Sequence, residues 1–252
     1  MLSGLTPQII NMKAMLFAAG LGTRLKPLTD KIPKGLAVVA GKTLLERAIT
    51  HLASYGVNYI VINIHHHGDQ IVEFLKNHDN FGLDIHISDE TAELLETGGG
   101  LMKAANHFSG NEPFVVINAD VISNINISKM MDVHKTKNAF ATLALRNRPE
   151  SSRQLLFDEN GQLCGRINRS KNERIISIDN PCLSEKAFSG IHILSPKWFE
   201  LTTQQGKFSI IDSYLDLCKN NTIQAYSHDE DYWFDVGSIE KLNEAEGYLT
   251  NK

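Results

Sequence analysis

The fold is decided by the stretch KAMLFAAGLGTR at residues 13–24, an apolar segment that runs directly into a glycine-rich turn. Its apolar part, residues 13–18, predicts a buried strand. Gly20 and Gly22 lack side chains, so the backbone N–H groups of the turn have room to approach phosphate oxygens closely. Arg24 adds fixed positive charge beside them. A strand followed by such a loop predicts a phosphate site at the carboxyl end of the strand.

This region nearly matches two familiar glycine motifs, but the spacing fits neither of them. The dinucleotide fingerprint needs a third glycine where Leu25 stands, and an acid about 20 residues later that is missing. A P-loop built on GKT at residues 41–43 needs its first glycine at Leu36, whereas the glycine is Gly35. The spacing therefore disfavours both a nicotinamide dehydrogenase and a P-loop kinase.

The charge of the chain is distributed unevenly. Residues 24–42 carry five basic side chains and one acid, although the whole chain of 252 residues has a net charge of −4. The local excess predicts a polyphosphate ligand, whereas the chain has no global basic field to hold nucleic acid or an anionic membrane. No apolar run reaches the roughly 18 to 20 residues of a membrane span. We therefore expect neither nucleic acid nor a membrane as a partner.

The three cysteines indicate the compartment. Cys164, Cys182 and Cys218 are odd in number, widely spaced and without a Cys-x-x-Cys pair. This pattern favours neither a disulfide framework nor a cysteine metal site. We expect a reducing, cytoplasmic setting.

The rest of the chain alternates short apolar runs with helical patterns, which is typical of a Rossmann-like, mostly parallel mixed sheet flanked by helices. We expect one domain at residues 12–252, with a nucleotide-binding lobe at about 12–125 and a second lobe with C-terminal closure at about 126–252. The predicted strands are 13–18, 59–64, 83–88, 113–120, 141–145, 154–157, 163–167 and 188–194, with a β segment at 223–234. The predicted helices are 44–52, 71–75, 98–107, 197–203 and 209–219, and a final helix capped by Ser238.

Residues 1–11 precede the first strand without a pattern of their own. From Met12 onward the chain imitates a signal peptide, with one Lys and a short apolar run. Gly20, Gly22 and Arg24 end that run too early, and a buried strand fits better. We therefore predict that residues 1–11 are a loose extension upstream of the natural start.

Two acidic residues stand out from the others. Asp120 ends an apolar strand, where a carboxylate can hold the Mg²⁺ of a nucleotide, although it can also simply cap the next turn. Asp235 lies within YWFDVGS at residues 232–238, and a carboxylate among bulky apolar residues needs a partner, for which a metal is one candidate. The remaining acids of residues 225–246 are explained by a solvated helix face.

Two further motifs are ambiguous. The histidines at residues 65–67 are contiguous, so their side chains cannot all converge on one metal ion, and a strand-to-helix turn is the favoured interpretation. The stretch LETGGG at residues 95–100 places three glycines at a helix start. Backbone N–H groups there can bind a base edge or a phosphate, or can form a plain helix cap.

Together these motifs resemble the sugar 1-phosphate nucleotidylyltransferases, also called nucleotide-sugar pyrophosphorylases. LETGGG, the compact length and the DVGS ending look most like the N-acetylmuramate 1-phosphate uridylyltransferases within that family. The chain departs from the family at Gly35 and Thr43, where proline is usual, and has no Glu-Lys-Pro motif for sugar hydroxyls. The motifs occur in the order of the family: AAGxGTR at 18–24, PK at 33–34, NAD at 118–120, FSGI at 188–191 and WFDVG at 233–237.

The resemblance implies a GT-A-like nucleotidyltransferase fold with a smaller sugar-binding β lobe. It implies a Mg²⁺-dependent enzyme, a monomer or a homodimer, that joins a nucleoside triphosphate to a sugar 1-phosphate and releases pyrophosphate. Mannose or heptose 1-phosphate guanylyltransferases and glucose 1-phosphate thymidylyl- or uridylyltransferases remain alternatives. A non-catalytic sensor of nucleotide sugars is the competing class of protein.

The same resemblance assigns roles to individual residues. Arg24 contacts the leaving β and γ phosphates, and Lys34 contacts the attacking or α phosphate. Asp120 and Asp235 bind Mg²⁺, and Gly190 lies beside the sugar. The expected nucleotide-binding residues are Ala18, Ala19, Gly20, Gly22, Thr23, Glu90, Thr97 and Gly98.

Overall fold

The computed structural model describes residues 12–251, and the predicted extension at 1–11 lies outside the described residues. One ten-stranded sheet forms the centre, with β1 (Met12–Phe17), β4 (Val57–Ile64), β5 (Asp84–Asp89), β6 (Phe114–Asn118), β8 (Ala141–Arg146), β9 (Arg153–Phe157), β10 (Leu163–Asn168), β11 (Glu173–Ile176), β12 (Ser184–Leu194) and β13 (Ile223–Ser227). The strand order is β11-β10-β9-β12-β6-β1-β4-β5, with β8 paired to β12 and β13 paired to β8.

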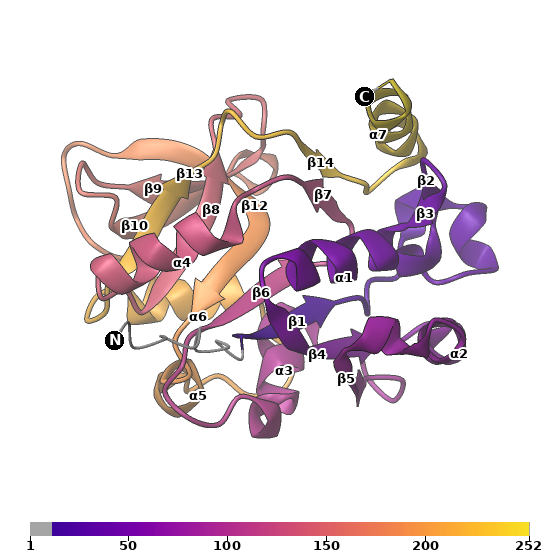
Figure 1. Cartoon of the computed structure of the whole chain (residues 1–252). Coiled ribbons are helices and arrows are strands. Elements are labelled where there is room, and N and C mark those ends of the chain that lie inside the picture. The colour runs from indigo at the N-terminus through magenta and orange to yellow at the C-terminus, as the bar shows by residue number, and fades with distance from the viewer. Residues whose placement is uncertain (1–11, 252) are drawn as a thin grey trace, which may run out of the picture.

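The strands of the sheet are parallel in one part and mostly antiparallel in the other (Figure 1). Strand β1 pairs in parallel with β4 and β6, and β4 pairs in parallel with β5. Strand β12 is antiparallel to β6, β8 and β9, so it joins the first half of the chain to the second. The two expected lobes therefore share one continuous sheet, and the expected Rossmann-like mixed sheet is confirmed, with its parallel part in the first half.

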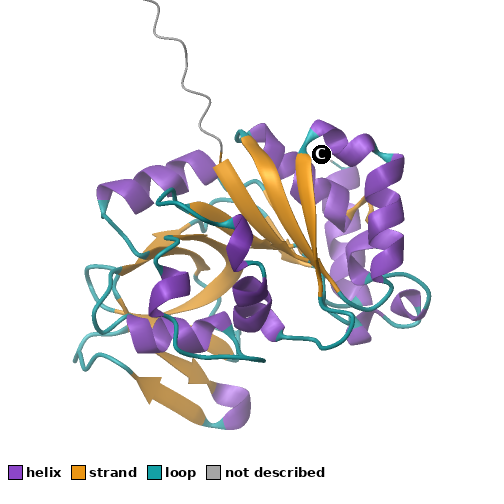
Figure 2. Ribbon diagram, turned by 90° about the horizontal axis from the view of Figure 1, so that it is seen from below, coloured by secondary structure: helices purple, strands orange, loops and turns teal. Residues whose placement is uncertain are grey.

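Helices cover the sheet on both sides (Figure 2). Successive side chains of β1 alternate between the faces, as the pleat of a strand requires. Leu16 packs in the same core as Leu45 and Ile49 of the first helix, whereas Met15 packs in a second core with Trp198 and Tyr214. The helices are α1 (Leu44–Ser54), α2 (Gly68–Asn77), α3 (Glu96–Lys103), α4 (Ile127–Thr136), α5 (Trp198–Leu201), α6 (Ile210–Leu217) and α7 (Ile239–Thr250).

Helix ends follow local sequence signals. The Thr43 side chain accepts a hydrogen bond from the backbone N–H of Glu46 and caps α1. Ser238 accepts one from Lys241 N–H, which confirms the cap predicted for the final helix. Within residues 12–251, no helix combines the length and the apolar character needed to cross a membrane.

The β segment expected at 223–234 is in fact two strands separated by a turn. β13 ends at Ser227, and β14 (Trp233–Asp235) leaves the main sheet to pair antiparallel with β7 (Val121–Ser123). Neither β7 nor this pairing was expected, because three residues are too few for a periodic pattern. Helix α4 and strand β11 were also missed, as was the small pair of β2 (Val38–Val39) and β3 (Lys42–Thr43).

Candidate active site

Two adjoining cavities open at the carboxyl ends of β1 and β6. The smaller cavity, about 330 Å³, lies between the loop after β1 and the start of α3. The larger cavity, about 750 Å³, is lined by β9, β10, β12 and β14. Both are lined by Arg24, Glu96, Asn118 and Asp120. The arrangement suits two ligands that meet at shared charged groups.

The glycine-rich loop lines the smaller cavity. Apart from its two chain neighbours, no described residue has an atom within 4 Å of the position where a side chain of Gly20 would begin, so the backbone there is open to a ligand. Gly22 has a φ of 62°, and a Cβ on it would lie 2.8 Å from Cγ2 of Thr29. Thr29 Oγ1 also donates a 2.8 Å hydrogen bond to the carbonyl of Gly22. Gly22 therefore fixes the turn that brings Thr23 and Arg24 to the cavity wall.

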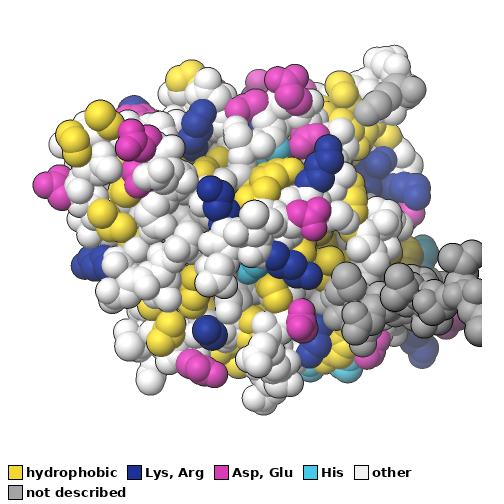
Figure 3. Space-filling view, turned by 60° about the vertical axis from the view of Figure 1, so that its left-hand side comes forward, with side chains coloured by type: hydrophobic (Ala, Val, Ile, Leu, Met, Phe, Trp, Pro, Cys, Tyr) yellow, Lys and Arg dark blue, Asp and Glu magenta, His cyan; other side chains and the backbone are white. Residues whose placement is uncertain are grey.

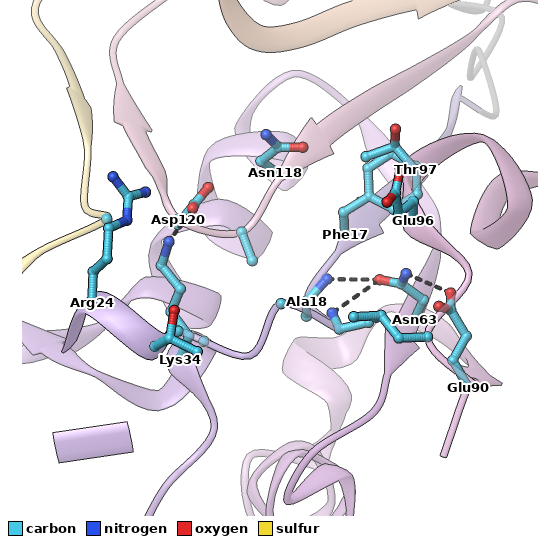
Figure 4. A pocket seen from close by; sticks show the side chains of 18 residues that line it. Phe17, Ala18, Arg24, Lys34, Asn63, Glu90, Glu96, Thr97, Asn118 and Asp120 are labelled. Carbon is cyan, nitrogen blue, oxygen red and sulfur yellow. Dashed lines mark hydrogen bonds and ion pairs between the residues drawn. The ribbon is translucent and has the colours of Figure 1, made fainter. Parts of the chain in front are cut away.

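A buried amide holds the start of this loop, as Figure 4 shows. Oδ1 of Asn63, at the end of β4, accepts hydrogen bonds from the N–H groups of Ala18 (2.7 Å) and Ala19 (3.3 Å). Its Nδ2 donates to Oε1 of Glu90 at 2.7 Å, and Leu95 N–H donates to Oε2 of Glu90 at 3.1 Å. Ala18 and Ala19 line the cavity, but their N–H groups are engaged by Asn63 instead of facing a ligand.

Glu90 also lines the smaller cavity, at the expected place. Its side chain is fully buried and both carboxylate oxygens accept hydrogen bonds from the protein, so it holds Asn63 and the backbone of Leu95 before α3. Sequence reasoning missed Asn63. The signal was an asparagine near the end of the apolar strand VNYIVINI at residues 57–64, because a buried amide needs partners.

The start of α3 is fixed by the segment before α6. Thr97 lines the smaller cavity, and its Oγ1 accepts a 3.0 Å hydrogen bond from Ile210 N–H. Gly98 N–H donates to the carbonyl of Phe208 at 2.9 Å, and a Cβ on Gly98 would overlap the Phe208 ring. Gly98 does not line either cavity. Gly98 thus packs against Phe208, and its contact with the base stays a prediction.

The charged residues expected to bind phosphates gather on the opposite side of the cavity from Glu96 (Figure 4). Nζ of Lys34 forms an ion pair with Oδ2 of Asp120, and these side chains are only 13% and 23% exposed. The guanidinium of Arg24 packs against Gly237, where a Cβ would lie 2.6 Å from Nη2. Arg24, Lys34 and Asp120 therefore form one charged group at the junction of the two cavities.

The two expected metal ligands are brought together by the pairing of β7 with β14. Asp235 is opposite Val121 in this pairing, and Val236 N–H donates a 2.9 Å hydrogen bond to the carbonyl of Asp120. Both Asp120 and Asp235 line the larger cavity, and Nζ of Lys241 lies 3.4 Å from Oδ2 of Asp235. Over residues 12–251 there is no cluster of three or more His, Cys, Asp or Glu that could hold a metal. Two carboxylates suit Mg²⁺, which keeps water and phosphate oxygens as its other ligands.

The larger cavity is lined by polar and basic side chains from the second half of the chain. Gly190 has a φ of 75°, and a Cβ on it would lie 2.7 Å from Nδ2 of Asn118. The guanidinium of Arg148 lies 4.8 Å from the ring centroid of Trp233. Arg153 and Lys171 line the same cavity and form no ion pair with other described residues.

The histidines at residues 65–67 lie in the turn between β4 and α2, which confirms the expected turn. His65 Nδ1 is 2.7 Å from the carbonyl of Glu90, and the rings of His66 and His67 are 3.8 Å apart. On the face shown in Figure 3, Lys and Arg side chains lie singly among acidic and apolar ones. The grouped cations described above are those that line the cavities.

The comparisons with known proteins agree with this geometry. A family model described as Nucleotidyl transferase matches residues 13–252. The N-acetylmuramate alpha-1-phosphate uridylyltransferase of Neisseria meningitidis is 30% identical over 93% of this chain and 97% of that protein. The mannose-1-phosphate guanyltransferase of Yarrowia lipolytica is also 30% identical, over 90% of this chain, but the match spans only 61% of that protein.

A solved structure has the same fold. The UDP-glucose pyrophosphorylase of Acinetobacter baumannii superposes with a TM-score of 0.78, at 18% identity, over 95% of this chain and 93% of that one. The family match runs from β1 through α7 and includes the glycine-rich loop, Asp120 and Asp235. The chain belongs to the nucleotidyl transferase family.

Proposed function

We propose that this protein is a sugar 1-phosphate nucleotidylyltransferase. The observation that carries the proposal is the pair of adjoining cavities that share Arg24 and Asp120. A nucleoside triphosphate fits the smaller cavity, with its phosphates beside the glycine-rich loop. The sugar 1-phosphate fits the larger one, so that the two phosphate groups meet at the shared charges.

The reaction forms one P–O bond and breaks another. An oxygen of the sugar 1-phosphate attacks the α-phosphorus, and the bond between that phosphorus and the bridging oxygen to the β-phosphate breaks as pyrophosphate leaves. The nucleophile is already an anion at neutral pH, so no general base is needed, and catalysis consists of alignment and charge neutralisation. We assign Arg24 to the leaving phosphates and Lys34 to the α or attacking phosphate, since both line the smaller cavity beside the glycine-rich loop.

Asp120 and Asp235 are the residues that we assign to Mg²⁺. Their carboxylates lie in one cavity wall and supply the one or two protein ligands that Mg²⁺ uses beside phosphates. When bound there, Mg²⁺ would neutralise phosphate charge. Lys34 and Lys241, which contact these carboxylates in the structure, are then left to interact with substrate oxygens.

Our best assignment of the substrates is N-acetylmuramate 1-phosphate and UTP. Two observations support it. This chain and the meningococcal uridylyltransferase match over nearly their full lengths, and Arg153 and Lys171 line the larger cavity without an ion pair to any residue of 12–251. N-acetylmuramate carries a lactyl carboxylate that these cations can bind, whereas N-acetylglucosamine lacks it. The cysteine usage fits the cytoplasm as the compartment of such an enzyme.

The mannose-1-phosphate guanyltransferase relative supports a second candidate, transfer of GMP to mannose 1-phosphate. Pyrophosphate release, measured for the purified protein with UTP, GTP and dTTP against four sugar 1-phosphates, distinguishes the candidates. The sugars are N-acetylmuramate, N-acetylglucosamine, mannose and glucose. We expect UTP with N-acetylmuramate 1-phosphate to be turned over fastest. Binding without turnover of any pair would refute the enzyme and favour the sensor.

The cation assignment has its own test. Replacing Arg153 or Lys171 by Met is expected to raise KM for N-acetylmuramate 1-phosphate about tenfold or more, the scale of a hydrogen bond to a charged group. KM for N-acetylglucosamine 1-phosphate stays within twofold. Lys137→Met, at the end of α4 and away from both cavities, is the matched control. Equal effects on both sugars would refute the carboxylate contact.

A further inference from the structure

Glu96 is the first residue of α3 and has an unusual backbone conformation. Its φ of 60° lies in the left-handed region, which favours glycine over residues with a Cβ. The stretch LETGGG at residues 95–100 is rich in glycine, yet position 96 carries a long acidic side chain. Strained residues of this kind cluster at ligand sites when the surrounding structure holds them in place.

The backbone on both sides of Glu96 is held by neighbours. Before it, Leu95 N–H donates to Oε2 of Glu90 at 3.1 Å, and the Leu95 carbonyl accepts from Phe208 N–H at 3.2 Å. After it, Gly98 N–H donates to the Phe208 carbonyl at 2.9 Å. The fold therefore imposes the positive φ, and glycine would satisfy it without strain. The backbone gives no reason for a glutamate, so the reason lies in its side chain.

The side chain of Glu96 lies at the junction of the two cavities and lines both. It is exposed, and its carboxylate makes no hydrogen bond or ion pair with any residue described in the structure. Figure 4 shows it beside Thr97, across the smaller cavity from Arg24 and Lys34. A free acceptor thus lies on the wall of the smaller cavity opposite Arg24 and Lys34.

We propose that Glu96 is a specificity residue whose carboxylate accepts hydrogen bonds from the ribose hydroxyl groups of the nucleoside triphosphate. This inference rests on the proposed function, which puts the phosphates beside Arg24 and Lys34. The ribose follows the phosphates along a nucleotide, which brings it toward Glu96. An ionised carboxylate only accepts hydrogen bonds, so it binds hydroxyl donors and repels phosphate. Because Glu96 also lines the larger cavity, hydroxyls of the sugar are the competing source of the same contact.

The test compares Glu96→Gly and Glu96→Gln with the wild type and with Glu93→Gln. Glu93 is an exposed carboxylate three residues away that lines neither cavity, so it is the matched control. KM is measured for UTP, dUTP and the sugar 1-phosphate, and equilibrium binding of UTP and dUTP is measured by calorimetry. Thermal unfolding of each variant is recorded in parallel.

We expect Glu96→Gly to weaken UTP binding about tenfold, the scale of a hydrogen bond to a charged group, while dUTP binding changes less. Glu96→Gln keeps one acceptor and is expected to lie between. The Tm of Glu96→Gly should be equal to or higher than that of the wild type, because glycine relieves the strained φ. A structural role would instead lower the Tm.

Three results would overturn the inference. An unchanged affinity for UTP in Glu96→Gly, together with an unchanged preference for UTP over dUTP, removes the ribose contact. A rise in KM for the sugar 1-phosphate alone assigns the carboxylate to the sugar instead. An equal loss of UTP affinity in Glu93→Gln would mean that the effect comes from the removal of a negative charge in general and not from a contact of Glu96. If the wild type turns over no substrate pair, the proposed function fails, but the calorimetric comparison of UTP with dUTP still decides the role of Glu96.

Discussion

Removing the amide of Asn63 should destabilise the protein strongly, because one side chain satisfies three buried polar groups. Asn63→Ala leaves the N–H groups of Ala18 and Ala19 and Oε1 of Glu90 without their partner. A buried polar group that loses its hydrogen bond costs about 1 to 3 kcal/mol, and the 3.3 Å bond to Ala19 is the weakest of the three. We expect a loss of about 3 to 5 kcal/mol in the free energy of unfolding, out of the roughly 5 to 15 kcal/mol of a typical domain.

The assay is equilibrium unfolding in urea at pH 7.5, with Asn58→Ala as the matched control. Asn58 lies on the same strand, β4, but its buried Oδ1 has no hydrogen-bond partner within residues 12–251, so its removal should change the free energy of unfolding by less than about 1 kcal/mol. The loop that Asn63 holds lines the smaller cavity, so KM for the nucleoside triphosphate should rise more than KM for the sugar 1-phosphate. A loss below about 1 kcal/mol for Asn63→Ala, equal to that of Asn58→Ala, would refute the reasoning.

Three further perturbations test other parts of the site. Asp120→Asn or Asp235→Asn is expected to lower kcat at least about a hundredfold, the scale of one lost preorganised electrostatic contact, and near-normal rates at saturating Mg²⁺ would refute the metal assignment. Gly237→Ala should displace the Arg24 guanidinium, because the new Cβ would lie 2.6 Å from its Nη2, and should lower kcat several-fold. The Tm should not fall, since the end of an Arg side chain moves easily. A lower Tm with a normal kcat would contradict this expectation. Three buried histidines should make the free energy of unfolding fall between pH 6.5 and 5, by up to about 1.4 kcal/mol per pH unit and per histidine. The reason is that histidines in the unfolded chain take up protons near their ordinary pKa of 6.5, whereas these histidines in the folded chain do not. Urea unfolding at pH 7 and pH 5 measures the fall, and equal free energies would contradict it. Burial lowers the pKa to about 4 in His134, about 3 in His192 and about 4 in His228.

The sequence predicted most long strands correctly because their apolar runs are continuous and are bounded by clear turns. It also predicted that Asp120 and Asp235 belong to one site, through the resemblance to a family. It did not predict how they meet. The pairing of β7 with β14 joins residues more than a hundred positions apart, and a three-residue strand has no periodic signal of its own.

Asn63, Glu90 and Gly98 have local roles in the site that the sequence alone did not predict, for one physical reason. Asn63 and Glu90 act through hydrogen bonds to groups that only the folded chain brings near. Gly98 is required by the ring of Phe208, a neighbour across more than a hundred residues. A glycine in a sequence shows that space or backbone freedom is needed, but it does not show whether a ligand or a side chain fills that space.

The C-terminal segment completes the site in two ways at once. Strand β14 supplies Asp235, and Gly237 directly after it supports the guanidinium of Arg24. Val236 is fully buried in a core with Ala245 of α7 and Ile122 of β7, so the helix and both strands are packed as one unit. Arg24 after the glycine-rich loop and Asp235 of the C-terminal segment therefore lie in the wall of the same cavity. Because their positions depend on this small core, we expect a change in the packing of α7 to affect both Arg24 and Asp235.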